Sequence, residues 1–266
     1  GEKLPTAAEV SEFVGKLTDS VLNPMAETEV EHRLGVIAGM AAHGFPIMPN
    51  GDPLTVERLQ CLGSDFGMKP SFERVHWILD SAFLDGDGSA SAASPLSDEF
   101  LTRVMNATSS RPLYWPLQEF IYANGEMDQP IRWAAQRVRD GKSEFGADVR
   151  PLNFTGEAMF PWMFEQEAAL RPFKPAMDLL MEDTSFGVIY DEDQLARNEV
   201  PLQAGVYFDD MYVDAGLSLD TAKRVNGVHA WVTNEFEHDG LRLGGVAPRL
   251  FDALAARLGG TLRERG

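Results

Sequence analysis

The fold of this chain is decided by residues 201–242, PLQAGVYFDDMYVDAGLSLDTAKRVNGVHAWVTNEFEHDGLR. An apolar run over Val200–Asp210 predicts a buried strand, Ser218–Val225 predicts a short helix, and a second apolar run over Val228–Thr233 predicts another strand. This order is typical of a parallel α/β unit. Because functional groups in open α/β sheets lie at the carboxyl ends of the strands, we expect the residues after each strand to carry the chemistry.

An acid follows the first predicted strand and a histidine follows the second. Asp210 ends the first apolar run, and His238 lies in the loop after the second run. A carboxylate bound to histidine Nδ1–H fixes the tautomer and stabilises the imidazolium that forms when Nε2 takes a proton. The order acid then base is that of the Ser-His-Asp triad in α/β-hydrolases. The pattern therefore predicts two triad members, while a solvated turn acid and an ordinary loop histidine remain the alternative.

The nucleophile of such a triad is not evident. The elbow motif G-x-S-x-G does not occur in the sequence, and the nearest approach is Ser185 in DTSFG, residues 183–187. Ser185 follows a predicted helix, whereas the elbow needs a strand before the serine, and the interval to Asp210 is too short for the usual intervening elements. We therefore do not expect Ser185 to be the nucleophile, and this part of the triad is missing from the pattern.

The first two thirds of the chain have helical periodicity. Predicted helices span Ala7–Leu22, Thr28–His43, Thr55–Met68, Ser71–Leu84, Ser97–Ala107, Pro112–Asn124, Gln129–Arg139, Glu165–Met181 and, after the strands, Val246–Leu258. The change of pattern near residue 195 predicts two regions, 1–195 and 196–266. Since two parallel strands alone cannot make a stable sheet, we expect region 196–266 to dock onto strands that this chain does not obviously contain.

Composition restricts the partners and the compartment. The apolar content of 44% is sufficient for a packed core, and the formal charge of −18 disfavours nucleic acid and anionic membranes as partners. No apolar run approaches the roughly 18 residues of a membrane span, and the first residues have no signal or transit pattern. A single cysteine, Cys61, excludes an internal disulfide and is typical of a reducing compartment. These features predict a soluble cytoplasmic protein.

The sequence predicts no metal ion and no organic cofactor. The segment that begins at Asp85, DGDGSASAASPLS, resembles the start of a calcium loop. Such a loop needs glycine at its sixth position and glutamate at its twelfth, where this chain has Ala90 and Leu96. The histidines on predicted helices lack a second histidine at i+4, so surface or core positions are expected for them.

Residues 201–242 resemble the C-terminal segment of the proline iminopeptidases, which are serine peptidases of the α/β-hydrolase fold. The resemblance extends through NFTGEAMFPWMFE (153–165), PLYWPLQEFIYANG (112–125) and NGDPLTVERLQCLG (50–63) to the first helices. It implies an α/β-hydrolase-type fold with a mostly helical cap over 1–195, followed by the last two strands and helices of the hydrolase core over 196–266. The family's HGGP-like loop and GQSFGG-like serine elbow precede the cap, and neither occurs here. The resemblance therefore implies that the nucleophile-bearing half is either a second chain or fragment or a part missing from this sequence, and that this chain alone hydrolyses nothing.

The resemblance also implies roles for individual residues. Asp210 would be the triad acid and His238 the triad base, while Glu119 and Glu157 would bind the protonated amine of the substrate. Trp162 or Tyr122 would form an apolar or cation–π wall for the pyrrolidine ring. The implied function is release of N-terminal proline from peptides with a free N-terminus. Alternatives are a hydrolase of another amide or ester, a non-catalytic cap or binding module that acts with a partner, and, for both glutamates, a surface or capping role.

Overall fold

The computed structural model describes residues 29–44, 46–83, 95–109 and 111–259. They form two compact units. Among the described residues, the strand unit comprises 67–69 and 188–259, and the helical unit comprises those between 29 and 66 and between 70 and 187. The predicted helix over 7–22 and residues 85–94 of the calcium-like sequence lie outside the described residues.

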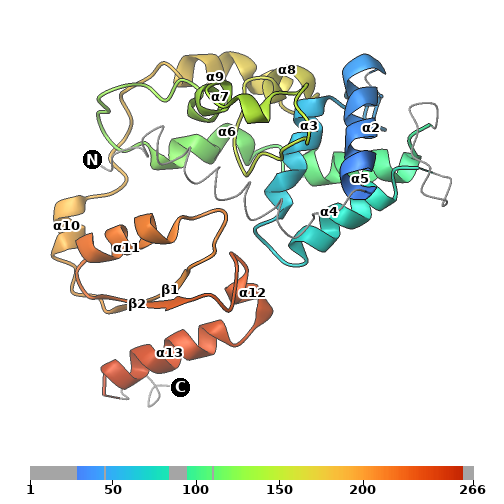
Figure 1. Ribbon diagram of the computed structural model, residues 1–266. Coiled ribbons are helices and arrows are strands. Elements are labelled where there is room, and N and C mark those ends of the chain that lie inside the picture. The colour runs from blue at the N-terminus through green and yellow to red at the C-terminus, as the bar shows by residue number, and fades with distance from the viewer. Residues whose placement is uncertain (1–28, 45, 84–94, 110, 260–266) are drawn as a thin grey trace. The chain divides into compact units, whose positions relative to one another are not determined.

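The strand unit contains a parallel two-stranded sheet (Figure 1). Strand β1 (Leu202–Tyr207) pairs with β2 (Val228–Thr233), with Leu202 opposite Val228 and Tyr207 opposite Thr233. The other elements of this unit are helices α10 (Glu192–Ala196), α11 (Ala215–Arg224), α12 (Gly240–Leu243) and α13 (Val246–Arg257). Since α11 connects the two strands, both strands end at the same edge of the sheet. The predicted α/β character of this region is confirmed.

The helical unit is built from short helices joined by long irregular segments (Figure 1). Its α-helices are α2 (Glu29–Gly44), α3 (Val56–Gln60), α4 (Ser71–Asp80), α5 (Asp98–Ser109), α6 (Trp115–Gln118), α7 (Ala134–Asp140), α8 (Met163–Gln166) and α9 (Lys174–Leu180). Its 3-10 helices are η1 (Cys61–Asp65), η2 (Glu119–Tyr122), η3 (Ser143–Phe145) and η4 (Arg171–Phe173). Extended segments in the described part of this unit meet only in isolated β-bridges.

Several helices predicted for this unit are shorter than expected or divided, among them Thr55–Met68, which forms α3 and η1. The region 112–124 forms only α6 and η2, and 165–181 is divided between α8, η4 and α9, whose prolines lie in the first turns of η4 and α9. The helix predicted over 129–139 begins at Ala134, because Arg132 and Trp133 have φ values of 50° and 54°. These left-handed conformations exclude both residues from an α-helix.

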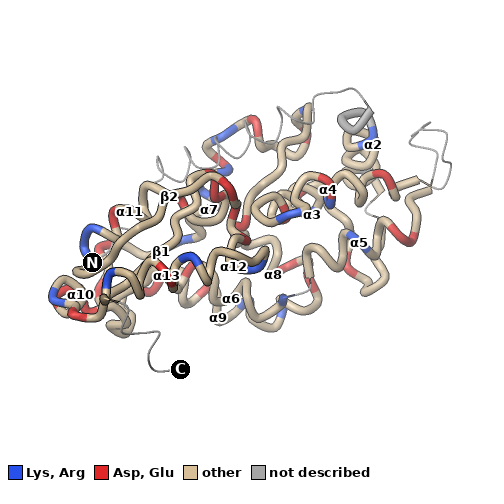
Figure 2. Tube along the Cα trace, turned by 90° about the horizontal axis from the view of Figure 1, so that it is seen from below, with Lys and Arg blue, Asp and Glu red and all other residues tan. Residues whose placement is uncertain are grey.

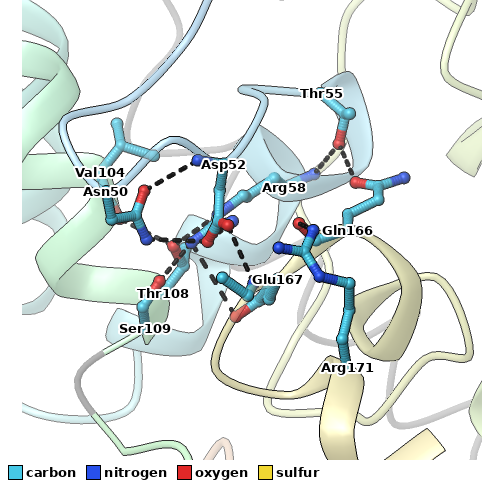
Figure 3. A network of polar contacts seen from close by, with 11 residues as sticks. Asn50, Asp52, Thr55, Arg58, Val104, Thr108, Ser109, Gln166, Glu167 and Arg171 are labelled. Atoms are coloured by element: carbon cyan, nitrogen blue, oxygen red, sulfur yellow. Dashed lines mark hydrogen bonds and ion pairs between the residues drawn. The ribbon is translucent and has the colours of Figure 1, made fainter.

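A buried charge network joins separate segments of the helical unit (Figure 3). The Arg58 side chain is fully buried, its Nη1 lies 3.2 Å from Asp52 Oδ2, and its Nε donates to Thr108 Oγ1 at 3.0 Å. Glu167 Oε2 lies 3.9 Å from Arg58 Nη2. Burial raises the pKa of Glu167 to about 7, Arg58 opposes this effect, and the charge of Asp52 adds to it. Two buried carboxyl groups therefore share one guanidinium, and Asp52 has the shorter contact with it.

Charged residues of both signs occur along both units (Figure 2). Among the described helices, none has the length and apolar content needed to cross a membrane. The prediction that nucleic acid is not a partner stays a prediction.

Candidate active site

The carboxyl ends of β1 and β2 bring Asp210 and His238 together. Asp210 lies after β1 and His238 lies after β2, and Asp210 Oδ2 is 2.9 Å from His238 Nδ1. The Asp210 side chain is only 6% exposed, whereas the His238 side chain is 36% exposed. The acid is therefore shielded from water, while part of the imidazole remains accessible.

The backbone that follows β1 orients the Asp210 carboxylate. Asp210 Oδ1 accepts hydrogen bonds from the N–H groups of Tyr212 and Val213 at 2.8 and 3.0 Å. These are local turn contacts of the kind that aspartate forms with backbone groups two or three residues ahead. They engage Oδ1 and direct Oδ2 toward His238.

The position of His238 is set by contacts outside the two strands. Its N–H donates to the carbonyl oxygen of Gly67 at 3.0 Å, and its imidazole makes an edge contact with the Tyr212 ring, with centroids 5.0 Å apart and planes at 83°. Since Nδ1 faces a carboxylate, Nδ1 carries the proton and Nε2 is the nitrogen that can accept another. The pair is therefore arranged as a general base and the acid that orients it.

Tyr207 lies beside this pair and was missed by the sequence analysis. Burial and the negative charges of Asp210 and Asp239 raise its pKa. Its hydroxyl group lies against Gly240, where an added Cβ would be 2.4 Å from the phenolic oxygen. Tyr207 follows the alternating pattern of β1, so nothing in the sequence distinguishes it from an ordinary strand residue.

Glu119, a predicted substrate ligand, is partly buried in η2 of the helical unit. Burial raises its pKa to about 7, while the Ala135 amide, the Arg137 guanidinium and the Ala134 amide lower it. Its Oε2 is buried without a hydrogen-bond partner among the described residues. Because Ala134 and Ala135 begin α7, this carboxylate is placed to interact with the positive end of that helix. The capping role left open by the sequence therefore has a structural basis.

Glu157 and Trp162 are associated with one apolar cluster of the helical unit. Burial, together with the charge of Glu157 and a hydrogen bond to its carboxylate, raises the pKa of Tyr114. Trp162 stacks on Phe160 with ring centroids 5.8 Å apart, and its Nε1 is buried without an acceptor in the described part of the chain. Tyr114 and Trp162 both pack against the cluster, whose buried members are Cys61, Trp115, Ile131, Met159, Phe160, Met163, Phe164, Leu170, Met177 and Met181.

The alanines that flank the Glu119 carboxylate, Ala134 and Ala135, pack against this same cluster. The three residues predicted to bind substrate are thus grouped around a single apolar region. Their roles stay predictions.

The described residues offer no evident nucleophile. Ser185 is exposed, forms an isolated β-bridge with Glu126 and donates its hydroxyl hydrogen to Glu126 Oε1 at 2.6 Å, so it does not lie at a strand-to-helix elbow. Burial raises the pKa of the Cys61 thiol to about 12, which keeps it protonated and unreactive. Among the described His, Cys, Asp and Glu residues there is no group that could hold a metal ion.

Comparisons with known proteins relate the chain to one enzyme family. It is 42% identical over 204 residues to a proline iminopeptidase of Aeromonas sobria, which covers 74% of this chain and 45% of that protein. It is 33% identical over 202 residues to the proline iminopeptidase aneH of Aspergillus aculeatus, which covers 74% of this chain and 44% of that protein. No family model matches the chain. The chain spans less than half the length of these relatives, and over the matched part it is a homologue of the proline iminopeptidases, which confirms the family resemblance predicted from its sequence.

Proposed function

We propose that this chain supplies the cap and the acid–base half of a serine peptidase that releases N-terminal proline from peptides. The observation that carries the proposal is the 2.9 Å contact between Asp210 Oδ2 and His238 Nδ1 at the carboxyl ends of paired parallel strands. The names of the two relatives support the choice of substrate. In this proposal residues 1–195 form the cap, and residues 196–266 form the end of an α/β-hydrolase core.

A second chain or fragment is proposed to complete the sheet and to carry the serine. Among the described residues, strands β1 and β2 pair only with each other, and an isolated pair of parallel strands is not stable in water. Large apolar side chains on both strands are exposed, among them Leu202 at 41% and Val232 at 44%. Further strands would cover such surface.

In the proposed reaction, the serine hydroxyl attacks the prolyl carbonyl carbon and His238 Nε2 accepts the hydroxyl proton. The imidazolium then gives this proton to the leaving amine, so that the peptide bond breaks and a prolyl ester of the serine remains. Water attacks this ester after His238 takes one of its protons, and the returned proton restores the serine hydroxyl as proline leaves. Asp210 holds the imidazole and stabilises its positive charge through each step.

Recognition of the substrate amine is proposed for Glu157 and Glu119. A secondary ammonium that leaves water requires a charge-assisted acceptor. The pKa of about 7 means that Glu119 is partly protonated near neutral pH, and a nearby ammonium would shift it toward the carboxylate form. Trp162, with its aromatic face, would form a wall for the pyrrolidine ring. An acetylated N-terminus has no such charge and would bind weakly.

A chimera tests the proposal. The matched segment of the Aeromonas sobria protein is replaced by that of this chain, and hydrolysis of a prolyl arylamide, an acetyl-prolyl arylamide and a simple ester is measured. We expect activity on the free prolyl substrate alone. His238→Gln and Asp210→Asn should each lower kcat by about 10⁴-fold, whereas Asp209→Asn, at an exposed neighbouring acid, should leave it unchanged.

Each other outcome of this assay has a definite meaning. A folded chimera whose prolyl activity survives His238→Gln would refute the proposed catalytic pair. Preference for the ester or the acetylated substrate would instead identify a hydrolase of another specificity. If a serine-reactive phosphonate does not label the folded chimera and no substrate is cleaved, the chain is a binding module rather than part of a peptidase.

A further inference from the structure

The loop that contains His238 is held by a segment from a distant part of the sequence, residues 67–69. The His238 N–H donates to the Gly67 carbonyl oxygen at 3.0 Å, and the Lys69 N–H donates to Asp239 Oδ2 at 2.8 Å. Asp239 is only 3% exposed. A hydrogen bond to a buried carboxylate is among the stronger contacts in a protein, so residues 238 and 239 are anchored from outside the sheet.

Tyr212 connects this segment to both members of the pair. Its N–H donates to Asp210 Oδ1 at 2.8 Å, and its ring makes the edge contact with the His238 imidazole at 5.0 Å. The same ring lies against Gly67, where an added Cβ would be 2.4 Å from Tyr212 Cε2 and 2.7 Å from Cδ2 and Cζ. Gly67 does not have a positive φ, so the close approach of the ring is what requires a glycine there.

We propose that Gly67, Tyr212 and Asp239 are positioning residues that fix the imidazole of His238 for proton transfer. The bond to Asp210 holds only Nδ1, and the terminal torsion of a histidine side chain has a broad energy profile. The imidazole could therefore turn while Nδ1 stays bonded to Asp210. Nε2 would then move away from the serine hydroxyl group. The ring edge of Tyr212 opposes this rotation, and residues 67–69 hold the backbone on which His238 is carried.

The importance of this support for catalysis rests on the proposed peptidase function, but the support itself is tested by proton exchange in the folded chimera, which supplies the further strands and does not need to be active. The probe is the His238 Nδ1–H proton in nuclear magnetic resonance spectra, assigned by its loss in His238→Gln. Exchange of this proton with water reports how firmly the imidazole is held. Backbone amide exchange in β1 and β2 is measured in the same samples, because a merely structural role would change those amides as well.

The test uses Gly67→Ala, Asp239→Asn and Tyr212→Leu. The leucine variant keeps the backbone contact to Asp210 and removes the ring edge, so it remains informative if Gly67→Ala does not fold. The matched controls are Gly205→Ala, where the nearest atom to an added Cβ is 3.7 Å away, and Asp209→Asn at an exposed acid.

We expect Nδ1–H exchange to become about tenfold faster in the three variants, with the strand amides and both controls unchanged. Unchanged Nδ1–H exchange in folded Tyr212→Leu and Asp239→Asn would overturn the inference. In the chimera, the same two variants should lower kcat without changing KM. A chimera without prolyl activity would count against the proposed function and would leave the exchange result standing.

Discussion

Replacing Glu167 by glutamine should stabilise the helical unit above neutral pH. Glu167 is 1% exposed and shares the Arg58 guanidinium with Asp52. Asp52 has the shorter ion pair, at 3.2 Å against 3.9 Å, and it also accepts the Ala168 N–H at 2.9 Å. Glu167 Oε1 is buried without a partner among the described residues. Ionised Glu167 is thus poorly compensated, and glutamine keeps its shape without the charge.

The sign of the pH dependence follows from the raised pKa. Burial raises the pKa of Glu167 from 4.5 to about 7. Between these values the folded chain binds more protons than the unfolded chain, so the free energy of unfolding falls as pH rises. The loss of stability caused by ionised Glu167 vanishes below the pKa of the unfolded chain. It is complete above the pKa of the folded chain, where it reaches about 3 kcal/mol. Between pH 5.5 and pH 8, the free energy of unfolding of Glu167→Gln should rise by about 2 kcal/mol relative to that of the parent chain.

Urea unfolding at pH 5.5 and pH 8 measures this difference, since both values lie above the isoelectric point of about 4.6. Tryptophan fluorescence reports mainly on the helical unit, which holds four of the five tryptophans, Trp77, Trp115, Trp133 and Trp162. Glu165→Gln is the control, because its side chain is 61% exposed. Equal or lower stability of Glu167→Gln at pH 8 would show that the ionised carboxylate is compensated by Arg58, and would refute the reasoning.

Three further predictions concern the helical unit. Gly63→Ala should lower the free energy of unfolding in urea by about 1–3 kcal/mol, because the added Cβ would lie 2.3 Å from the Thr155 carbonyl oxygen. The control Gly141→Ala, whose Cβ would have no neighbour closer than 3.5 Å, should leave this free energy unchanged. Cys61, with its pKa raised to about 12, should react with a thiol reagent at pH 8 only after unfolding, and rapid labelling of the folded chain would contradict its burial. In the chimera, Glu157→Gln should raise KM for the prolyl arylamide about tenfold or more with kcat unchanged, and an unchanged KM would remove Glu157 from the amine site.

The strand–helix–strand region could be predicted from local sequence. Strand β2 has the predicted limits, Val228–Thr233, and β1 lies within the predicted run Val200–Asp210. A helix between parallel strands forces both carboxyl ends to one edge, so an acid after β1 and a histidine after β2 must approach each other. The proximity of Asp210 and His238 therefore follows from connectivity, and no long-range information was needed.

The support around this pair could not be predicted in the same way. Gly67 lies near the end of the helix predicted over Thr55–Met68. Its contact with Tyr212 depends on how two segments 145 positions apart pack together. Similarly, the left-handed Arg132 and Trp133 have no glycine or asparagine to indicate them, and the helix predicted across them begins late. Such features depend on tertiary contacts, which periodicity and capping rules do not describe.

Burial raises the pKa values of both Glu167 and Glu119, but the groups that surround the two carboxylates differ. Glu167 has a fixed cation, Arg58, within 3.9 Å. Glu119 has Arg137 nearby, but Nη1 of that guanidinium donates to the carbonyl oxygens of Ile131 and Arg132. The remaining compensation for Glu119 is the pair of amides at the start of α7, which carry only partial charges. A nearby ammonium would stabilise the ionised form of Glu119, which supports the proposal that Glu119 binds the substrate amine together with Glu157.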